Sequence, residues 1–306
     1  MVKLITTLNI NERGFHMEEI LYCLYYNLKH PLINDITIIF DIKNIPEKYE
    51  YKLLQSSCEI ADEFKVKFHP SFLSLLDNNN NIFFMITKSR PTYKYIFDYT
   101  NKIKDIWILC NVDIYYPHEN KSYLEQALST NYDNTMICLT RYDKIIYKRG
   151  HYTHFHDGYT LTYKNNTYKT QHVNGCSIDT WIYKSPIKDM DCNYNIELGR
   201  IGCDGMMNYQ LSKNYNVINP CFDVISIHNH KQHKIYNTIN QFVSYYNVIY
   251  KYSDFIKMMQ QKGFLLKNIG FSCIDKSNVV KNVNNRKIDH KKKVHKQKKM
   301  VHFLLK

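Results

Sequence analysis

Two small polar side chains, Asn111 and Asp113, follow a run of apolar residues in the segment 107–117, which reads WILCNVDIYYP. If the chain is extended there, both side chains point to the same side, because successive side chains of a strand alternate between its faces. An amide and a carboxylate presented together offer oxygen ligands to a cation or a sugar. A strand that ends in an Asx turn carries the same residue types, and the segment alone leaves both interpretations open.

The first half of the chain, which must position this pair, contains alternating sequence patterns of strands and helices. Short runs of β-branched and apolar residues predict strands, and apolar positions three and four residues apart predict helices. The expected strands are 3–9, 35–41, 65–69 and 105–116, and the expected helices are 16–31, 51–64 and 92–103. This order indicates an α/β, Rossmann-like fold with a mostly parallel central sheet flanked by helices.

Other polar residues also lie where strands are expected to end. Thr6 and Thr7 lie near the end of the first strand, Asp41 closes the second, and Arg90 precedes a helix that starts after Pro91. Ligands of such sheets bind beyond the carboxyl ends of the strands, so we expect these residues close to the first pair. Arg90 could pair with a phosphate. Singly, each residue also fits a strand-end hydroxyl, a turn or a surface side chain.

The second half of the chain has a different pattern. Alternating polarity at 134–148 predicts a sheet strand or a hairpin, and the segment 159–173 is expected to hold another hairpin, which indicates a smaller antiparallel portion. Asp204 follows Gly202 and precedes a helical stripe, where the helix dipole favours a carboxylate. Such a residue is either an N-cap or a group that accepts a proton.

Two histidines, His228 and His230, close the segment SIHNH. They are two residues apart and share one face if that strand is extended. A second histidine group, in the segment 151–158, forms an H-x-H pair without a Cys or Glu partner at a recognisable spacing, which favours an exposed loop over a metal site.

The order of these motifs resembles that of the GT-A fold glycosyltransferases, which use nucleotide sugars. A polar-x-Asp pair closes a strand, an acid begins a helix, and a histidine follows a short strand. More narrowly, DTWIYK, GCDGMMNYQLSKNYNVINP and SIHNH resemble a branch of glycosyltransferases found in giant DNA viruses and microbes. The resemblance covers roughly residues 1–235.

The resemblance implies transfer of a sugar from a nucleotide sugar, with UDP favoured over GDP, to a glycan or protein acceptor. It implies Mn²⁺ or Mg²⁺ held by Asp113 with His228 or His230, next to the donor diphosphate. Asp204 is the implied base and Asp179 the second choice for that role. Trp181 either stacks on a sugar ring or packs in the core.

The sequence departs from the family pattern at Asn111, which is neutral where the first acid of the metal motif is expected. An amide oxygen still suits a hard cation, but one charge fewer weakens metal affinity. Gly205 and the pair His172 and Val173 are further departures. A nucleotide-sugar-binding or glycan-binding protein of the same fold with impaired catalysis therefore remains the alternative.

Charge is concentrated at one end of the chain. The net charge is +13, and residues 281–306 contain ten Lys or Arg against one acid, so about +4 is left for the other residues. This basic segment is either a solvated tail or a contact for anionic lipid or nucleic acid, which keeps a nucleic-acid-associated function open. The nine cysteines form no C-x-x-C pair, so no zinc site is indicated.

We expect three regions: a GT-A-like domain at 1–235, a helical extension at 236–280 and the basic tail at 281–306. The first divides into a nucleotide-binding half at about 1–115 and an acceptor half at about 116–235. No apolar run has the length of a membrane span, and the N-terminus has no signal-peptide pattern. A cytoplasmic location, or one inside a virion if the protein is viral, is expected.

Overall fold

The computed structural model describes ten ranges of the chain. They are residues 1–9, 15–42, 70–144, 160–164, 166–170, 177–188, 192–200, 202–229, 243–245 and 248–250. The chain divides into two compact units, Met1–Gly270 and Phe271–Lys306, and every described residue belongs to the first. The expected helix at 51–64, strand at 65–69 and basic tail lie outside the described residues, and the domain boundaries stay predictions. In the described ranges, no helix is long and apolar enough to cross a membrane.

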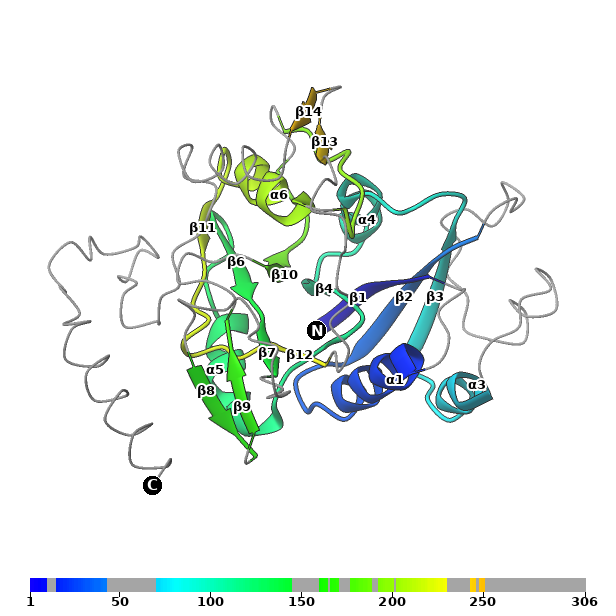
Figure 1. Cartoon of the computed structure of the whole chain (residues 1–306). Helices are drawn as coiled ribbons and strands as arrows, with labels where there is room; N and C mark the ends of the chain where they lie inside the picture. Colours follow the sequence, from blue (N-terminus) through cyan, green and yellow to red (C-terminus); the bar gives the residue numbers. More distant parts are fainter. Residues whose placement is uncertain are drawn as a thin grey trace, which may run out of the picture. The chain divides into compact units, whose positions relative to one another are not determined.

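Strands and helices alternate in the first part of the described chain, as expected (Figure 1). The helices are α1 (Phe15–Leu28), α3 (Pro70–Asp77), α4 (Tyr93–Thr100), η2 (His118–Asn120), α5 (Lys121–Leu128) and α6 (Cys203–Leu211). The first strands are β1 (Val2–Asn9), β2 (Asp35–Asp41), β3 (Ile82–Thr87), β4 (Ile106–Cys110), β5 (Ile114–Tyr115), β6 (Thr135–Thr140) and β7 (Tyr142–Lys144). The later strands are β8 (Thr160–Tyr163), β9 (Asn166–Lys169), β10 (Ile178–Lys184), β11 (Asn216–Ile218), β12 (Ile227–His228), β13 (Val243–Tyr245) and β14 (Val248–Tyr250).

A seven-stranded sheet in the order β11-β6-β10-β4-β1-β2-β3 forms the centre of the fold. Strands β3, β2, β1 and β4 run parallel, as do β11 and β6, whereas β10 is antiparallel to both of its neighbours. The expectation of a mostly parallel sheet flanked by helices is therefore confirmed. Strand β6 is buried along its whole length and mainly apolar, because both faces of the sheet are covered.

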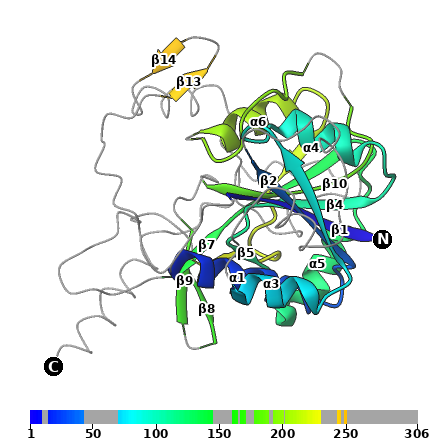
Figure 2. The same cartoon turned by 90° about the vertical axis from the view of Figure 1, so that its right-hand side faces the viewer.

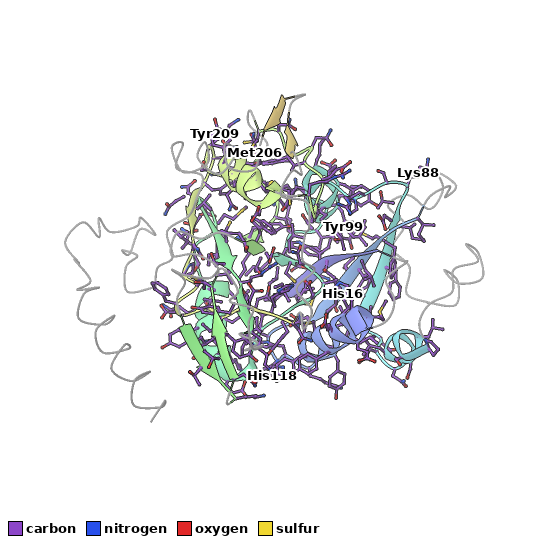
Figure 3. All side chains as sticks on the ribbon, viewed as in Figure 1. His16, Lys88, Tyr99, His118, Met206 and Tyr209 are labelled. Atoms are coloured by element: carbon purple, nitrogen blue, oxygen red, sulfur yellow. The ribbon has the colours of Figure 1, made fainter. Side chains whose placement is uncertain are left out.

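Helices cover the two faces of this sheet. Figure 2 shows α4 and α6 on one face and α1, α3 and α5 on the other. Under α4 and α6, a cluster of buried side chains joins those helices to six strands, and Figure 3 labels two of its members, Tyr99 and Met206. Helix α4 begins after Thr92, whose side chain accepts a hydrogen bond from the backbone of Tyr95.

The sequence analysis did not predict strand β3, although it pairs with β2 along its whole length. Its sequence, IFFMIT, is a short continuous apolar run. Such a run has neither the alternation of a half-exposed strand nor the period of a helix, so the pattern carries little signal. A buried position on both faces of the sheet explains this composition.

A second sheet has the order β5-β12-β7-β9-β8. Strands β8 and β9 form the hairpin expected in the segment 159–173. The pairs β12–β5, β7–β9 and β8–β9 are antiparallel, which confirms the expected smaller antiparallel portion, while β12 and β7 run parallel, so the sheet is mixed. The described part of the segment 134–148 forms sheet strands, one of the two expected alternatives, with β6 in the large sheet and β7 in the smaller one.

Helix α1 packs against the smaller sheet. Its Cys23 belongs to a buried cluster with Tyr115, Tyr142 and other residues of the smaller sheet. Its Asn27 donates a hydrogen bond to the carbonyl of Ile114 at 2.8 Å and accepts one from the backbone N–H of Tyr116. These contacts hold the segment that follows β4 against the helix.

Candidate functional site

A pocket lies at the carboxyl edge of the parallel strands. Its lining includes the polar residues Thr7, Asp41, Arg90, Asn111 and Asp113, together with Gly199. The register of the strands explains why these residues lie close together. Strand β1 pairs with β2 as far as Asn9 and Asp41, and Ile5 of β1 pairs with Leu109 of β4. Parallel strands in this register end at the same edge, so residues distant in the sequence meet there. Thr6, in contrast, is completely buried within β1 and does not line the pocket.

Asn111 and Asp113 lie in a turn directly after β4, not in an extended strand. The backbone N–H of Ile114 donates to the carbonyl of Asn111 at 3.1 Å, which closes the turn. The two side chains accordingly turn to different partners: Asn111 contacts Asp179, and Asp113 contacts His228. The turn, one of the two alternatives that the sequence left open, is present, and the binding of a cation or sugar by this pair stays a prediction.

His228 of β12 lies between two carboxylates. Its Nε2 is 2.9 Å from Oδ2 of Asp113, and its Nδ1 is 2.6 Å from Oδ1 of Asp143. The pairing of β12 with β7 places His228 directly beside Asp143, and the backbone of Asn229 donates to the carbonyl of Asp113. The orientation of the imidazole is therefore determined by contacts at both of its nitrogens.

Arg141 connects this group to a second one. Its guanidinium is 3.2 Å from Asp143 and 2.6 Å from Oδ2 of Asp179. The other carboxylate oxygen of Asp179, Oδ1, accepts a hydrogen bond from the side-chain amide of Asn111 at 2.8 Å. A continuous chain of polar contacts thus runs from Asp113 through His228 and Arg141 to Asn111.

The charges in this chain shift the pKa values of its members. Burial and Arg141 favour the neutral form of His228, but the carboxylates of Asp113 and Asp143 outweigh them and raise its pKa to about 9. Burial alone would raise the pKa of Asp113, yet the neighbouring His228, Arg141 and His16 hold it well below its usual range. His16 lies near the start of α1 (labelled in Figure 3) and its Nδ1 is 3.2 Å from Glu19.

Asp204, in the first turn of α6, has the opposite environment. Burial and the charge of Asp179 raise its pKa to about 6, although the backbone N–H groups of Gly205 and Ile178 donate to it and oppose the shift. The donor from Ile178 is 3.2 Å from Oδ2 of Asp204. A carboxylate with this pKa accepts a proton readily near neutral pH.

A β-bulge positions Asp179 near Asp204. The register of β10 against β6 shifts between Ile178 and Thr180, so Asp179 is the extra residue. Bulges re-aim side chains and occur often beside functional sites. Both oxygens of Asp179 are engaged by Asn111 and Arg141, which makes Asp204 the better candidate base of the two acids predicted from the sequence.

Trp181 packs in the core. It is 2% exposed, its indole N–H donates to Asn208 at 3.0 Å, and its ring meets that of Tyr93 edge to face. The expected stacking of Trp181 on a sugar ring is therefore not supported, since the side chain faces α4 and α6 and not the pocket. Trp181 is therefore a core residue, which was the second possibility given by the sequence analysis.

Arg90 lies at the mouth of the pocket, before α4. Its Nη1 donates to the carbonyl of Gly199 at 3.3 Å, a contact between segments 109 residues apart. Gly199 has a φ of +70°, a conformation that glycine adopts without strain. The guanidinium keeps further donors, so an anion in the pocket can be bound by Arg90.

Within the described part of the chain, no group of three or more His, Cys, Asp or Glu side chains has an arrangement that could hold a metal ion. A metal ion bound here would therefore need to use fewer than three of these side chains as ligands. Mg²⁺ sites commonly use one or two carboxylates and complete the coordination with substrate phosphates. Asp113 is a carboxylate of this kind, and Nε2 of His228 would join it as a ligand only after losing the proton that its raised pKa of about 9 keeps there. Nδ1 of His228 faces Asp143, as is usual for metal-binding histidines, whose second nitrogen donates to a carboxylate.

Arg141 and Asp143 were not predicted from the sequence. They stand two residues apart in the mainly apolar stretch CLTRYDKIIY, which also contains Lys144. Asp143 is 3% exposed, and charged residues are rarely buried unless they are paired. Two opposite charges, two residues apart and next to a buried strand, were therefore the available signal. His230 and the histidines of 151–158 lie outside the described residues.

No protein-family model and no curated protein matches this sequence. Among solved structures, the chain is similar to a Bacillus anthracis protein assigned as a glucose-1-phosphate thymidylyltransferase, at 12% identity and a TM-score of 0.38, covering 72% of this chain and 87% of that one. It is similar to TarS of S. aureus, at 10% identity and a TM-score of 0.37, covering 75% of this chain and 36% of TarS. It is also similar to the 4-diphosphocytidyl-2C-methyl-D-erythritol synthase of Anaerococcus prevotii, at 9% identity and a TM-score of 0.36, covering 85% and 95%. These similarities concern the arrangement of the backbone.

Proposed function

We propose that this protein is a glycosyltransferase that moves a sugar from a nucleotide-sugar donor to a hydroxyl group of a glycan or protein. The supporting observation is the pocket at the carboxyl edge of the sheet, where Asp113 and Arg90 line one cavity and His228 contacts Asp113. The order of motifs that resembles GT-A glycosyltransferases adds to it. A UDP-sugar is the first donor to test and a GDP-sugar the second.

The donor would bind with its diphosphate between Arg90 and Asp113. Arg90 offers a guanidinium to one phosphate, and Thr7 and Asp41 present polar groups from the neighbouring strands. Asp113 and His228 would hold Mn²⁺ or Mg²⁺, with Asp143 keeping the imidazole in place. When bound, such an ion neutralises charge on the leaving diphosphate.

Asp204 would remove the proton from the acceptor hydroxyl as it attacks the sugar carbon. Its pKa of about 6 leaves it mostly ionised at neutral pH while keeping it basic enough to accept a proton. The backbone N–H of Ile178 orients one of its oxygens. Asp179 contributes by its charge, which raises the pKa of Asp204.

A thermal-shift screen of nucleotide sugars, with and without Mn²⁺, tests this proposal. We expect a UDP- or GDP-sugar with Mn²⁺ to raise the melting temperature, because a ligand that binds only the folded state stabilises it. Asp113→Ala should remove the effect of Mn²⁺, and Asp133→Ala, at an exposed position, is the matched control. No shift with any nucleotide sugar contradicts the proposal.

A binding protein without catalysis is the second candidate, and the neutral Asn111 motivates it. It predicts a thermal shift with a nucleotide sugar but neither hydrolysis nor transfer across a wide panel of acceptors. A location in the cytoplasm of a host cell, or in a virion, accompanies the proposed function as a further expectation.

A further inference from the structure

Asn111 is the position where the sequence departs from the metal motif that it resembles. One interpretation is that Asn111 is a weakened ligand, and that an aspartate there would improve the site. The contacts of Asn111 point to a different role. Its side-chain amide donates to Oδ1 of Asp179 at 2.8 Å, and its backbone N–H donates to the carbonyl of the same residue at 3.1 Å.

Asp179 needs this donor. It is 8% exposed, and its other oxygen, Oδ2, is 2.6 Å from Nη1 of Arg141. A buried carboxylate is stable when both oxygens are hydrogen-bonded and its charge is paired. Asn111 and Arg141 meet that requirement from two sides, one with a neutral donor and the other with a cation.

A carboxylate at position 111 would conflict with this arrangement. It has no proton to donate when ionised, and it would face the carboxylate of Asp179 at the distance of a hydrogen bond. Two like charges so close destabilise each other strongly. The nearby Asp204 would add a third negative charge, because it already interacts with Asp179.

We infer that Asn111 is a positioning residue that holds Asp179 through its amide, and that it is not a ligand of the proposed ion. The second part of this inference rests on the proposed function, whereas the first depends only on the contact between Asn111 and Asp179. Substituting Asn111 by aspartate should therefore damage the site, although it would make the sequence more similar to the metal motif.

A double-mutant cycle tests the inference with Asn111→Asp, Asp179→Asn and the variant that carries both changes. The double variant exchanges the two side chains and keeps the net charge of the wild type. The amide at position 179 can then donate to the carboxylate at position 111 and still accept from Arg141. We expect Asn111→Asp to lower the melting temperature by about 5 °C, and the exchange to recover at least half of that loss. Asn134→Asp, at an exposed position, is the matched control.

Mn²⁺ titration followed by electron paramagnetic resonance gives a second readout on the same proteins. We expect Asn111→Asp to bind Mn²⁺ no more tightly than the wild type. An increase in affinity of about threefold or more would identify Asn111 as a ligand position and overturn the inference. An unchanged melting temperature in Asn111→Asp, or no recovery in the exchanged variant, overturns it as well.

The two readouts separate the inference from the proposed function. If the wild type binds neither Mn²⁺ nor a nucleotide sugar, the proposed function fails, while the melting temperatures still decide whether Asn111 holds Asp179. If the wild type binds both and the cycle shows no coupling, the proposed function survives and the role inferred for Asn111 is wrong.

Discussion

Nδ1 of His228 lies 2.6 Å from Oδ1 of Asp143, and both side chains are almost completely buried. This contact directs Nε2 of the imidazole towards Asp113. A buried carboxylate behind a histidine determines how the imidazole ring is turned. The pair explains how a single histidine, 115 residues from Asp113, is aimed at it.

Asp143→Asn should weaken metal binding without removing either proposed ligand. The loss of the charged acceptor lowers the basicity and the order of the His228 ring, and changes of this kind reduce metal affinity by about 10- to 100-fold. Calorimetric titration with Mn²⁺ measures the effect, and Asp133→Asn, at an exposed position, is the control. Equal affinities of Asp143→Asn and the wild type would refute a role for Asp143 in orienting His228.

Activity should fall at acidic pH as Asp204 becomes protonated. Because its pKa is about 6, kcat/KM for transfer should decline below that pH by about tenfold per unit. Asp204→Asn should lose nearly all transfer while still binding the donor. A pH profile that stays flat between about pH 5 and pH 7 would exclude Asp204 as the base.

Protonation of Asp204 at low pH should raise the stability of the fold, although it lowers the activity. A carboxyl group whose pKa is raised on folding binds a proton more tightly in the folded state, so the wild type loses stability as the pH rises from about 4 to about 6. Asp204→Asn removes this cost, so its free energy of unfolding at pH 7 should be about 3 kcal/mol higher than that of the wild type. Urea unfolding at about pH 4 and pH 7 measures it, and the gain should vanish at the lower pH.

Arg141→Met should be strongly destabilising. The side chain is 19% exposed and pairs with Asp143 and Asp179, which would keep two negative charges without their cation. Removal of one partner from a buried ion pair costs about 3–5 kcal/mol. Arg200→Met is the matched control, because its ion pair with Glu197 is exposed and such pairs contribute about 1 kcal/mol or less. Similar unfolding free energies for the two variants would contradict the role given to Arg141.

Arg90→Met should leave the fold intact and weaken donor binding. Arg90 is exposed at the pocket, and a hydrogen bond to a charged group contributes about 1.5–3 kcal/mol, so the KM for the nucleotide sugar should rise about 10- to 100-fold. Lys94→Met on α4, which removes an exposed ion pair with Asp98, is the control. An unchanged KM in Arg90→Met would place the phosphates elsewhere.

Much of the large sheet could be predicted from local patterns. The predicted strand at 35–41 matches β2, and the predicted helix at 16–31 overlaps α1, because periodicity and proline reflect local backbone preferences. The position of Thr7, Asp41 and Asn111 at one edge also followed from the alternation of strands and helices, since parallel strands must end on the same side.

The contacts within the site could not be predicted in this way. Asn111 and Asp179 are 68 residues apart, and His228 and Asp143 are 85 apart. Their meeting depends on strand order: β10 is inserted beside β4, and β12 pairs with β7. Local patterns contain no information on which strands become neighbours, so Arg141 and Asp143 stood out only as charges in an apolar segment.

The sequence by itself determined the alternation of strands and helices and the polar residues at the ends of the parallel strands, because both follow from the local chemistry of the chain. The tertiary structure decided the roles of those residues. It assigned Trp181 to the core, turned Asn111 towards Asp179, and enclosed His228 between Asp113 and Asp143. The physical reason is that a buried polar side chain must find its partners in space, and those partners come from strands far apart in the sequence.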